Sequence, residues 1–105
     1  MRVVLCSVPP SDADRIARAL VERRLVACVS VVPAVTSTYR WKGAVEQSSE
    51  SLLILKTTQA HLATLLIELP KLHPYEVPEI VALPVARDDV HPAYLAWVEA
   101  ETRGE

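Results

Sequence analysis

The sequence of 105 residues lacks the features that mark several common classes of ligand and partner. It holds only two glycines, which excludes the glycine-rich loops that cradle phosphate groups. No apolar run approaches the roughly eighteen residues of a membrane-spanning helix, so we expect no membrane partner. Basic residues never cluster beyond the pair Arg23-Arg24, and the net charge is −2. The electrostatic footprint of a nucleic-acid-binding protein is therefore absent.

Cysteine is also scarce, because the chain has only Cys6 and Cys28. Two cysteines do not make a disulfide scaffold, and residues 6–9 lack the second cysteine of a metallochaperone C-x-x-C motif. The start of the chain shows no signal-peptide pattern, since apolar strand residues begin at Val3. We therefore expect a cytoplasmic protein that forms one domain over residues 1–105 and keeps its thiols reduced.

Two segments show helical periodicity in the first three quarters of the chain. The first, at about 12–24, follows an apparent capping box at residues 11–14. The second begins after Thr57 or Thr58, and Pro70 is expected to kink or end it. Its apolar stripe consists of five leucines, Leu62, Leu65, Leu66, Leu69 and Leu72.

Strand-like apolar runs alternate with these helices. They cover residues 3–8, 25–35 with a continuation to 41, 52–55 and 80–85, and a short helix follows at about 92–100. Lys42-Gly43 has the composition of a two-residue hairpin turn. The strand at 52–55 carries no stacking aromatic residue, which excludes an RNA-recognition domain.

The predicted order is β-α-β-β-α-β with an added C-terminal helix. This α+β order is typical of the ferredoxin-like fold, in which two helices cover one face of an antiparallel sheet. The strands do not alternate apolar and polar residues, so both faces of the sheet are expected to be buried. Because no further helix is available for the second face, we expect self-association through the sheet. The hairpin around Trp41 is long for one domain and is expected to reach a neighbouring subunit.

The segment 73–80 concentrates polar groups on a stiff backbone. It holds one imidazole, one phenol and two carboxylates, and its two prolines restrict the chain to non-helical conformations. Glu76 and Glu79 lie three residues apart in a segment expected to be extended, so they should diverge and not act as an acid–base pair. No Ser-His-Asp or Cys-His grouping can be placed together, and nothing in the sequence argues for an enzyme.

Separated segments along nearly the whole chain, from Val4 to Trp97, match one known family in order. They are Ala27-Cys28-Val29, residues 33–41, Leu55-Lys56-Thr57, residues 73–80, Leu83-Pro84-Val85 and residues 94–97. Together they resemble the CutA divalent-cation-tolerance family. The resemblance implies a ferredoxin-like fold assembled as a homotrimer, similar in architecture to the PII signalling proteins. It also implies a non-enzymatic role in tolerance to copper and other divalent cations.

The resemblance further implies which residues bind metal. Cys6 matches a cysteine at the end of the first strand, and His73 matches a histidine before Pro-Tyr; both are implied copper ligands. Copper or another divalent cation would be weakly bound, with Glu76 or Glu79 available for harder ions and no organic cofactor. The chain departs from the family pattern at Leu72, where copper-binding bacterial members can carry a second histidine, and at Ser30, Ala34 and Pro70.

Each candidate ligand also has a structural interpretation. Cys6 can be a small buried hydrophobe instead of a thiolate ligand for copper. The same holds more strongly for Cys28, which is structural or at most a weak ligand. His73 can simply donate a hydrogen bond to the last carbonyls of the preceding helix.

A second hypothesis places a binding pocket between subunits. In this case the protein is a PII-like small-molecule sensor or a protein-interaction scaffold. The aromatic residues can instead anchor the hairpin on its neighbour. The residues of this inter-subunit pocket are Tyr39, Trp41, Lys56, Tyr75, Glu76 and Glu79.

Overall fold

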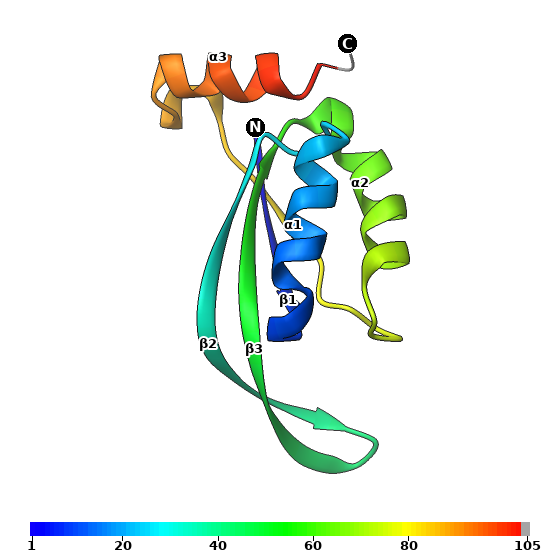
Figure 1. Ribbon diagram of the computed structural model, residues 1–105. Coiled ribbons are helices and arrows are strands. Elements are labelled where there is room, and N and C mark those ends of the chain that lie inside the picture. The colour runs from blue at the N-terminus through cyan, green and yellow to red at the C-terminus, as the bar shows by residue number, and fades with distance from the viewer. Residues whose placement is uncertain (104–105) are drawn as a thin grey trace.

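A computed structural model describes residues 1–103, and its elements follow the predicted order (Figure 1). The strands are β1 (Arg2–Val8), β2 (Cys28–Trp41), β3 (Ala44–Thr57) and β4 (Val81–Pro84). The helices are α1 (Ala13–Glu22), α2 (Gln59–Leu72) and α3 (Pro92–Glu101), with 3-10 turns η1 (Pro10–Asp12) and η2 (Arg87–Asp89). All strand pairs are antiparallel in the order β2-β3-β1-β4. This order confirms the ferredoxin-like prediction.

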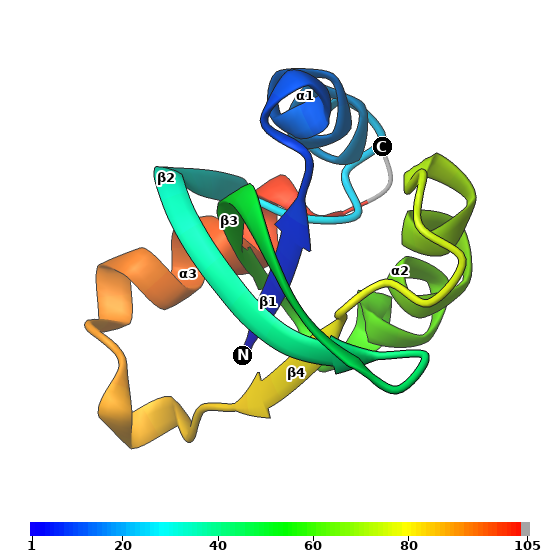
Figure 2. The ribbon, with the colours of Figure 1, turned by 90° about the horizontal axis from the view of Figure 1, so that it is seen from below.

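Helices α1 and α2 cover one face of the sheet, as Figures 1 and 2 show from two directions. The core between these layers is built from alternate strand residues and the inward stripes of the two helices. Its fully enclosed side chains include Val4, Cys6, Val8, Ile16, Leu20, Leu53, Leu55, Leu65 and Leu69. Within residues 1–103, no helix is long and apolar enough to cross a membrane.

The opposite face of the sheet is apolar but only partly covered within residues 1–103. We call this surface the open apolar face, and its members are Val3, Leu5, Val32, Leu52, Ile54, Val81 and Leu83. They share a side because Leu5 lies opposite both Ile54 and Val81 in the register, and directly opposed residues point the same way. This face is apolar but half-exposed in the single chain, so the expected burial of both faces through self-association stays a prediction.

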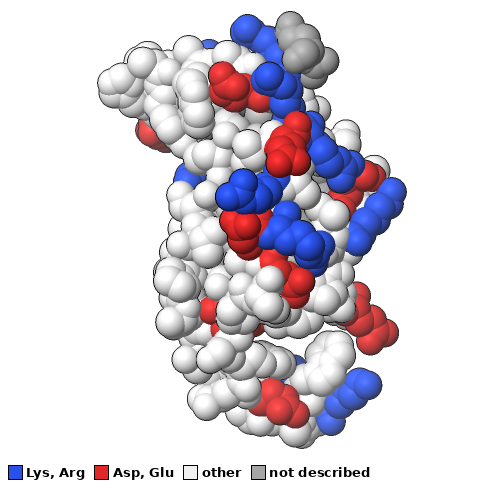
Figure 3. All heavy atoms as spheres, in the orientation of Figure 1, with Lys and Arg blue, Asp and Glu red and all other residues white. Residues whose placement is uncertain are grey.

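Charged side chains are concentrated over α1 and α2. Figure 3 shows this crowding, and it shows a mostly uncharged flank where β2 runs. Four ion pairs form on the helices: Arg15–Asp12, Arg18–Asp14, Arg23–Glu68 and Lys71–Glu68. Exposed pairs of this kind add little stability, but they indicate that the helical side is the solvated side of the molecule.

The β2–β3 hairpin extends beyond the helices and curls at its tip (Figure 1). Lys42 and Gly43 have φ values of 50° and 83°, which confirms the predicted two-residue turn. A bulge interrupts the pairing between Val32 and Val35, and Ala34 within it has φ of 59°. This conformation favours glycine because a Cβ atom is crowded there. The departure from the family pattern at Ala34 therefore places local strain in the hairpin.

The predicted starts of the two long helices need correction. The capping box at residues 11–14 does not form, because Pro10 begins a 3-10 turn and moves the N-cap to Asp12. Asp12 makes no cap hydrogen bond and pairs with Arg15 at 2.8 Å instead. Thr58 stands at the N-cap of α2, but its hydroxyl lies 2.9 Å from Nδ1 of His61 and caps no backbone N–H.

Two further boundaries also differ from expectation. Residues 25–27 are a buried connection and not part of β2, and the Thr57 hydroxyl donates to the Leu25 carbonyl at 2.7 Å. Helix α2 continues two residues beyond Pro70 and ends at Leu72. A proline so close to the C-terminus removes only one hydrogen bond of the final turn, so the helix tolerates it.

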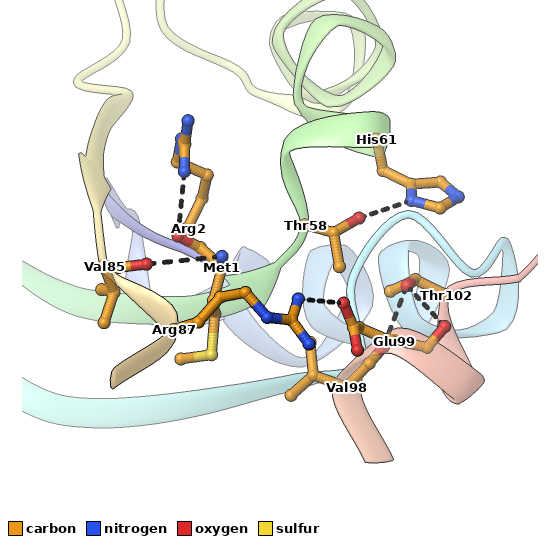
Figure 4. A network of polar contacts seen from close by, with 9 residues as sticks. All are labelled: Met1, Arg2, Thr58, His61, Val85, Arg87, Val98, Glu99 and Thr102. Atoms are coloured by element: carbon orange, nitrogen blue, oxygen red, sulfur yellow. Dashed lines mark hydrogen bonds and ion pairs between the residues drawn. The ribbon is translucent and has the colours of Figure 1, made fainter. Parts of the chain in front are cut away.

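Polar contacts hold the C-terminal helix near the chain start (Figure 4). Arg87 in η2 donates to the Glu99 carboxylate of α3 at 2.9 Å. The amino group of Met1 donates to the Val85 carbonyl at 3.5 Å, and the Thr102 hydroxyl donates to the Val98 carbonyl at 2.9 Å. Helix α3 lies at the end of the sheet away from the hairpin tip (Figure 1).

Candidate functional site

A cavity of about 710 Å³ lies between the curled hairpin and the segment 73–79. This volume falls within the range of small-molecule sites, which is about 300–1,000 Å³. Strand β1 contributes one lining residue, the hairpin contributes five and the segment 73–79 contributes five. They are Ser7; Ser37, Thr38, Tyr39, Trp41 and Glu50; and Pro74, Tyr75, Glu76, Val77 and Glu79.

The hairpin presents four of its lining residues on one face. In the register, Ser37 lies opposite Ser48, Tyr39 opposite Glu46, and Trp41 opposite Ala44. Because alternate strand residues share a face, this face also carries Glu50. It continues the side of the sheet that holds the open apolar face, through Glu50 and Leu52 on β3. The cavity therefore opens toward the side that the single chain leaves uncovered.

Glu50 is the most enclosed charged residue of the cavity, with a relative exposure of 5%. Its Oε2 atom accepts a hydrogen bond from the Tyr75 hydroxyl at 2.8 Å, which ties the segment 73–79 to β3. Within residues 1–103, every fully enclosed side-chain oxygen has a partner, whereas Oε1 of Glu50 makes no hydrogen bond. Oε1 therefore reaches the open volume of the cavity.

The other two carboxylates also border this cavity. Glu79 accepts a hydrogen bond from the Ser7 hydroxyl at 3.3 Å, and Glu76 lies on the same lining. The expectation that this segment is extended is wrong, because the chain bends at residues 75–77. The divergence of Glu76 and Glu79 stays a prediction. The bend curves the segment around the cavity, and both residues line it.

The cavity is electronegative. Among residues 1–103, no lysine or arginine side chain lines it, while three carboxylates do. Burial, followed by the hydrogen bond to Glu50 and its charge, raises the pKa of Tyr75 to about 12. The phenol thus stays protonated and keeps donating to Glu50 across the physiological pH range.

His73 fixes the shape of the segment from inside the fold. Its Nε2 donates to the Ser7 carbonyl at 2.8 Å, and its Nδ1 accepts the Tyr75 backbone N–H at 3.1 Å. These partners assign the proton to Nε2 and use both ring nitrogens. The alternative that His73 donates to the helix carbonyls is wrong, because the ring turns toward β1. A metal ion at His73 must displace one of these two hydrogen bonds.

Cys6 lies in the core on the helix-covered face, with no exposed surface. Burial raises the pKa of its thiol to about 12, and the charges of Glu79 and Glu50 add to the shift. Since the thiolate is the form that ligates metal, the proton of Cys6 must leave at a cost. Within residues 1–103, no group of three or more His, Cys, Asp or Glu side chains is arranged to hold a metal ion. Metal ligation by Cys6 and His73 stays a prediction.

The remaining two predicted residues lie away from the cavity. Lys56 donates to the Ser30 hydroxyl at 2.8 Å, at the end of the hairpin opposite its turn. Cys28 is half-buried, and its sulfur is 3.5 Å from the Tyr94 hydroxyl of α3. Five of the six residues of the predicted pocket therefore line one cavity, and Lys56 does not.

Sequence reasoning missed Ser7, Ser37 and Glu50. Ser7 and Glu50 sit where polar residues meet apolar strand runs, which is also the pattern of an ordinary strand end. The sequence feature that could have identified Glu50 is its spacing to Leu52 and Ile54, because alternate residues of β3 share one face. A carboxylate in that row is buried against the sheet, which makes it worth testing as a ligand group.

Comparisons with known proteins agree along the full length. A model of the CutA1 divalent ion tolerance protein family matches residues 2–101. The chain is 50% identical to the divalent-cation tolerance protein CutA of Thermus thermophilus, over 95% of this chain and 96% of that protein. It is 47% identical to mouse Protein CutA over 86% of the chain, which spans half the length of that relative.

Solved structures show the same fold. The PII-like protein CutA from Nostoc sp. PCC 7120, in apo form, superposes with a TM-score of 0.94 at 38% identity, and each chain is fully covered. CutA from Xylella fastidiosa superposes with a TM-score of 0.92 at 37% identity, with 97% of each chain covered. With the family match, the identities and these superpositions together, this chain belongs to the CutA family of divalent ion tolerance proteins.

Proposed function

We propose that this protein is a non-enzymatic, homotrimeric binding protein of the cytoplasm that supports divalent-cation tolerance as a PII-like small-molecule sensor. The single observation that carries the proposal is the cavity anchored on Glu50. The cavity has the volume of a small-molecule site, and it contains the buried carboxylate of Glu50, whose Oε1 atom makes no hydrogen bond. Binding sites are typically concave surfaces with a few convergent polar groups, and this cavity has that composition.

The trimer is supported by the open apolar face. Val81 and Leu83 on the edge strand are 48% and 45% exposed, next to half-buried Leu5 and Ile54. Contiguous apolar surfaces of this kind mark association sites in soluble proteins. Because the ion pairs of α1 and α2 lie on the opposite, helix-covered side, association through the sheet leaves them in solvent. The cavity opens on the associating side, so neighbouring subunits would border it.

A fragment titration tests the binding function. Two-dimensional NMR spectra are recorded while a panel of small anionic, neutral and cationic aromatic fragments is added to the intact protein. We expect shifts at the cavity residues, above all the Trp41 indole N–H, and none at the Trp97 indole on α3. Shifts that appear equally at both indoles, or at neither, would overturn a ligand site in this cavity.

Copper binding at Cys6 and His73 is the second candidate. The observation that favours it is their common neighbour, Ser7. His73 bonds to the Ser7 carbonyl, Glu79 bonds to its hydroxyl, and Cys6 precedes it in the chain. Thiolate and imidazole together suit copper, and a copper ion between them offsets part of the cost of removing the thiol proton.

A copper titration against a competing chelator, under reducing conditions, tests this candidate. We expect one weak site per chain that is lost in His73→Ala and kept in His91→Ala, whose histidine is exposed at the N-cap of α3. Circular dichroism confirms that both variants fold. Equal copper affinity of the two variants contradicts ligation by His73, whatever the fragment titration shows.

A further inference from the structure

We propose that the cavity selects an organic ammonium ion, meaning a small molecule that carries a protonated amine on an apolar or aromatic body. The inference rests on the proposed ligand-binding function and names the chemical class of the ligand. It is carried by three properties of the cavity: the sign of its charges, the buried position of one carboxylate and the aromatic residues of its wall.

The first property is charge of one sign. Glu50, Glu76 and Glu79 line the cavity, and among residues 1–103 no lysine or arginine side chain shares the lining. The hydroxyl groups of Ser7 and Tyr75 already donate to Glu79 and Glu50. An anionic ligand such as a phosphate would meet three like charges. A cation lowers the electrostatic energy of the site.

The second property is the position of Glu50. A carboxylate with 5% exposure has lost most of its hydration, and one neutral phenol on Oε2 compensates only part of this loss. Its open Oε1 atom can accept an N–H from an ammonium group. Such a charge-assisted hydrogen bond is shorter and roughly twice as strong as one between neutral groups. The buried carboxylate thus gains its missing partner when a cationic ligand enters.

The third property is the aromatic and apolar character of the cavity wall. Tyr39, Trp41 and Tyr75 present aromatic rings to the lining, with Pro74 and Val77 beside them. Aromatic faces attract organic cations, and their carbon surface packs against the body of the ligand. The Trp41 ring already has a cation nearby, because Lys42 Nζ lies 5.9 Å from its centroid. A bare metal ion gains nothing from this carbon surface, and a volume of about 710 Å³ far exceeds its size.

Three probes that share one ring and differ in charge test the inference. Benzylammonium, benzyl alcohol and benzoate are titrated into the intact protein at neutral pH, and the Trp41 indole signal is followed by NMR. We expect benzylammonium to bind at least about tenfold more tightly than benzyl alcohol, from one added charge-assisted contact. Benzoate should bind most weakly. Equal or tighter binding of benzyl alcohol or benzoate overturns the cationic class while leaving ligand binding itself established.

Variants separate the carboxylate contact from general charge effects. Glu50→Gln keeps the shape and an acceptor for Tyr75, and it should weaken benzylammonium about tenfold without changing benzyl alcohol. Glu79→Gln, at an exposed site, provides a second variant if Glu50→Gln does not fold, and it should weaken benzylammonium by a smaller factor. Glu22→Gln on α1 removes the same charge outside this cavity and should change neither probe.

The outcomes distinguish this inference from the proposed function. If none of the three probes shifts the Trp41 indole, the inference is overturned, and the wider fragment panel decides separately whether the cavity binds ligands. If Glu22→Gln weakens benzylammonium as much as Glu50→Gln does, the preference reflects net charge and the assigned contact is wrong. If calcium ions alone shift the cavity signals and benzylammonium does not, the site takes inorganic cations and the inference also fails.

Discussion

The two halves of strand β3 lie in different environments. From Ser51 to Thr57, alternate side chains are enclosed beneath α1 and α2, and Leu53 and Leu55 have no exposed surface. From Ala44 to Ser49 the same strand forms the hairpin, where no side chain is fully buried. One half of the strand contributes to the core, whereas the other half pairs with the β2 residues that line the cavity, and Glu50 lies at the junction between the two halves.

This difference means that the residues that stabilise the fold and the residues that surround the cavity lie in different halves of one hairpin. The helix-covered half gains its free energy of folding from apolar burial. The hairpin half has polar residues, a strained bulge at Ala34 and a carboxylate at Glu50, and these features add little apolar burial to the single chain. We therefore propose that contacts with neighbouring subunits stabilise it.

Truncating the core should cost far more than truncating the hairpin. Leu55→Ala leaves a cavity beneath the helices and should lower the free energy of unfolding by about 3 kcal/mol. Glu46→Ala, in the hairpin half of the same strand, should change it by less than about 0.5 kcal/mol. Urea denaturation of both variants and the wild type measures the difference. Similar losses in the two variants would contradict the division of β3.

Alkaline pH should lower the free energy of unfolding through Cys6, which is buried in the helix-covered half of the fold. Its thiol ionises near pH 9 in the unfolded chain, but burial holds its pKa near 12 in the folded protein. The unfolded state therefore binds fewer protons between pH 9 and 12, and stability falls as pH rises through this range. The effect amounts to about 2 kcal/mol between pH 9 and 11. Denaturation curves at several pH values should show a flatter decline for Cys6→Ala; parallel declines would contradict this assignment.

Charging the open apolar face should dissociate the proposed trimer. Val81→Asp places a carboxylate on this face and should weaken association at least about tenfold, because an unpaired charge is costly in an interface. Ile67→Asp, on the exposed side of α2, is the matched control and should leave association unchanged. Sedimentation velocity over a dilution series compares the variants. Dissociation of the α2 variant instead would place the interface on the helices.

The bulge should give the smallest effect and the opposite sign. Ala34→Gly removes the Cβ atom at a residue with φ of 59° and should stabilise the protein by about 0.5–1 kcal/mol. Thermal unfolding measures this gain against Ala44→Gly near the turn, where the strand conformation is ordinary and glycine should destabilise. A loss of stability in both variants would show that Ala34 is unstrained.

The fold could be predicted because its signals are local. Hydrophobic periodicity located the helices, Lys42-Gly43 located the turn, and the two-faced apolar strands predicted an uncovered face. The helix starts were harder, because Pro10 favours a 3-10 turn over the capping box that follows it. Helix boundaries of this kind depend on competition between neighbouring turns.

The site was only partly predictable because it depends on curvature and register. Tyr39, Trp41 and Tyr75 were expected to line one pocket, and they do. Glu50 was not expected there, because its position opposite Val35 depends on a β-bulge that the sequence does not reveal. Lys56 was predicted to line the pocket, but its side chain donates to Ser30 and lies away from the cavity. The side-chain partners of His73 could not be read from spacing, since they come from β1 and from its own segment.

The central claim is that neighbouring subunits complete the hairpin half and border its cavity. Light scattering coupled to size-exclusion chromatography tests it most directly, on the wild-type protein at micromolar concentration. We expect a single species with three times the 11.6 kDa mass of the chain. A species with the mass of one chain at the same concentrations would contradict it, because the open apolar face would then be left in water.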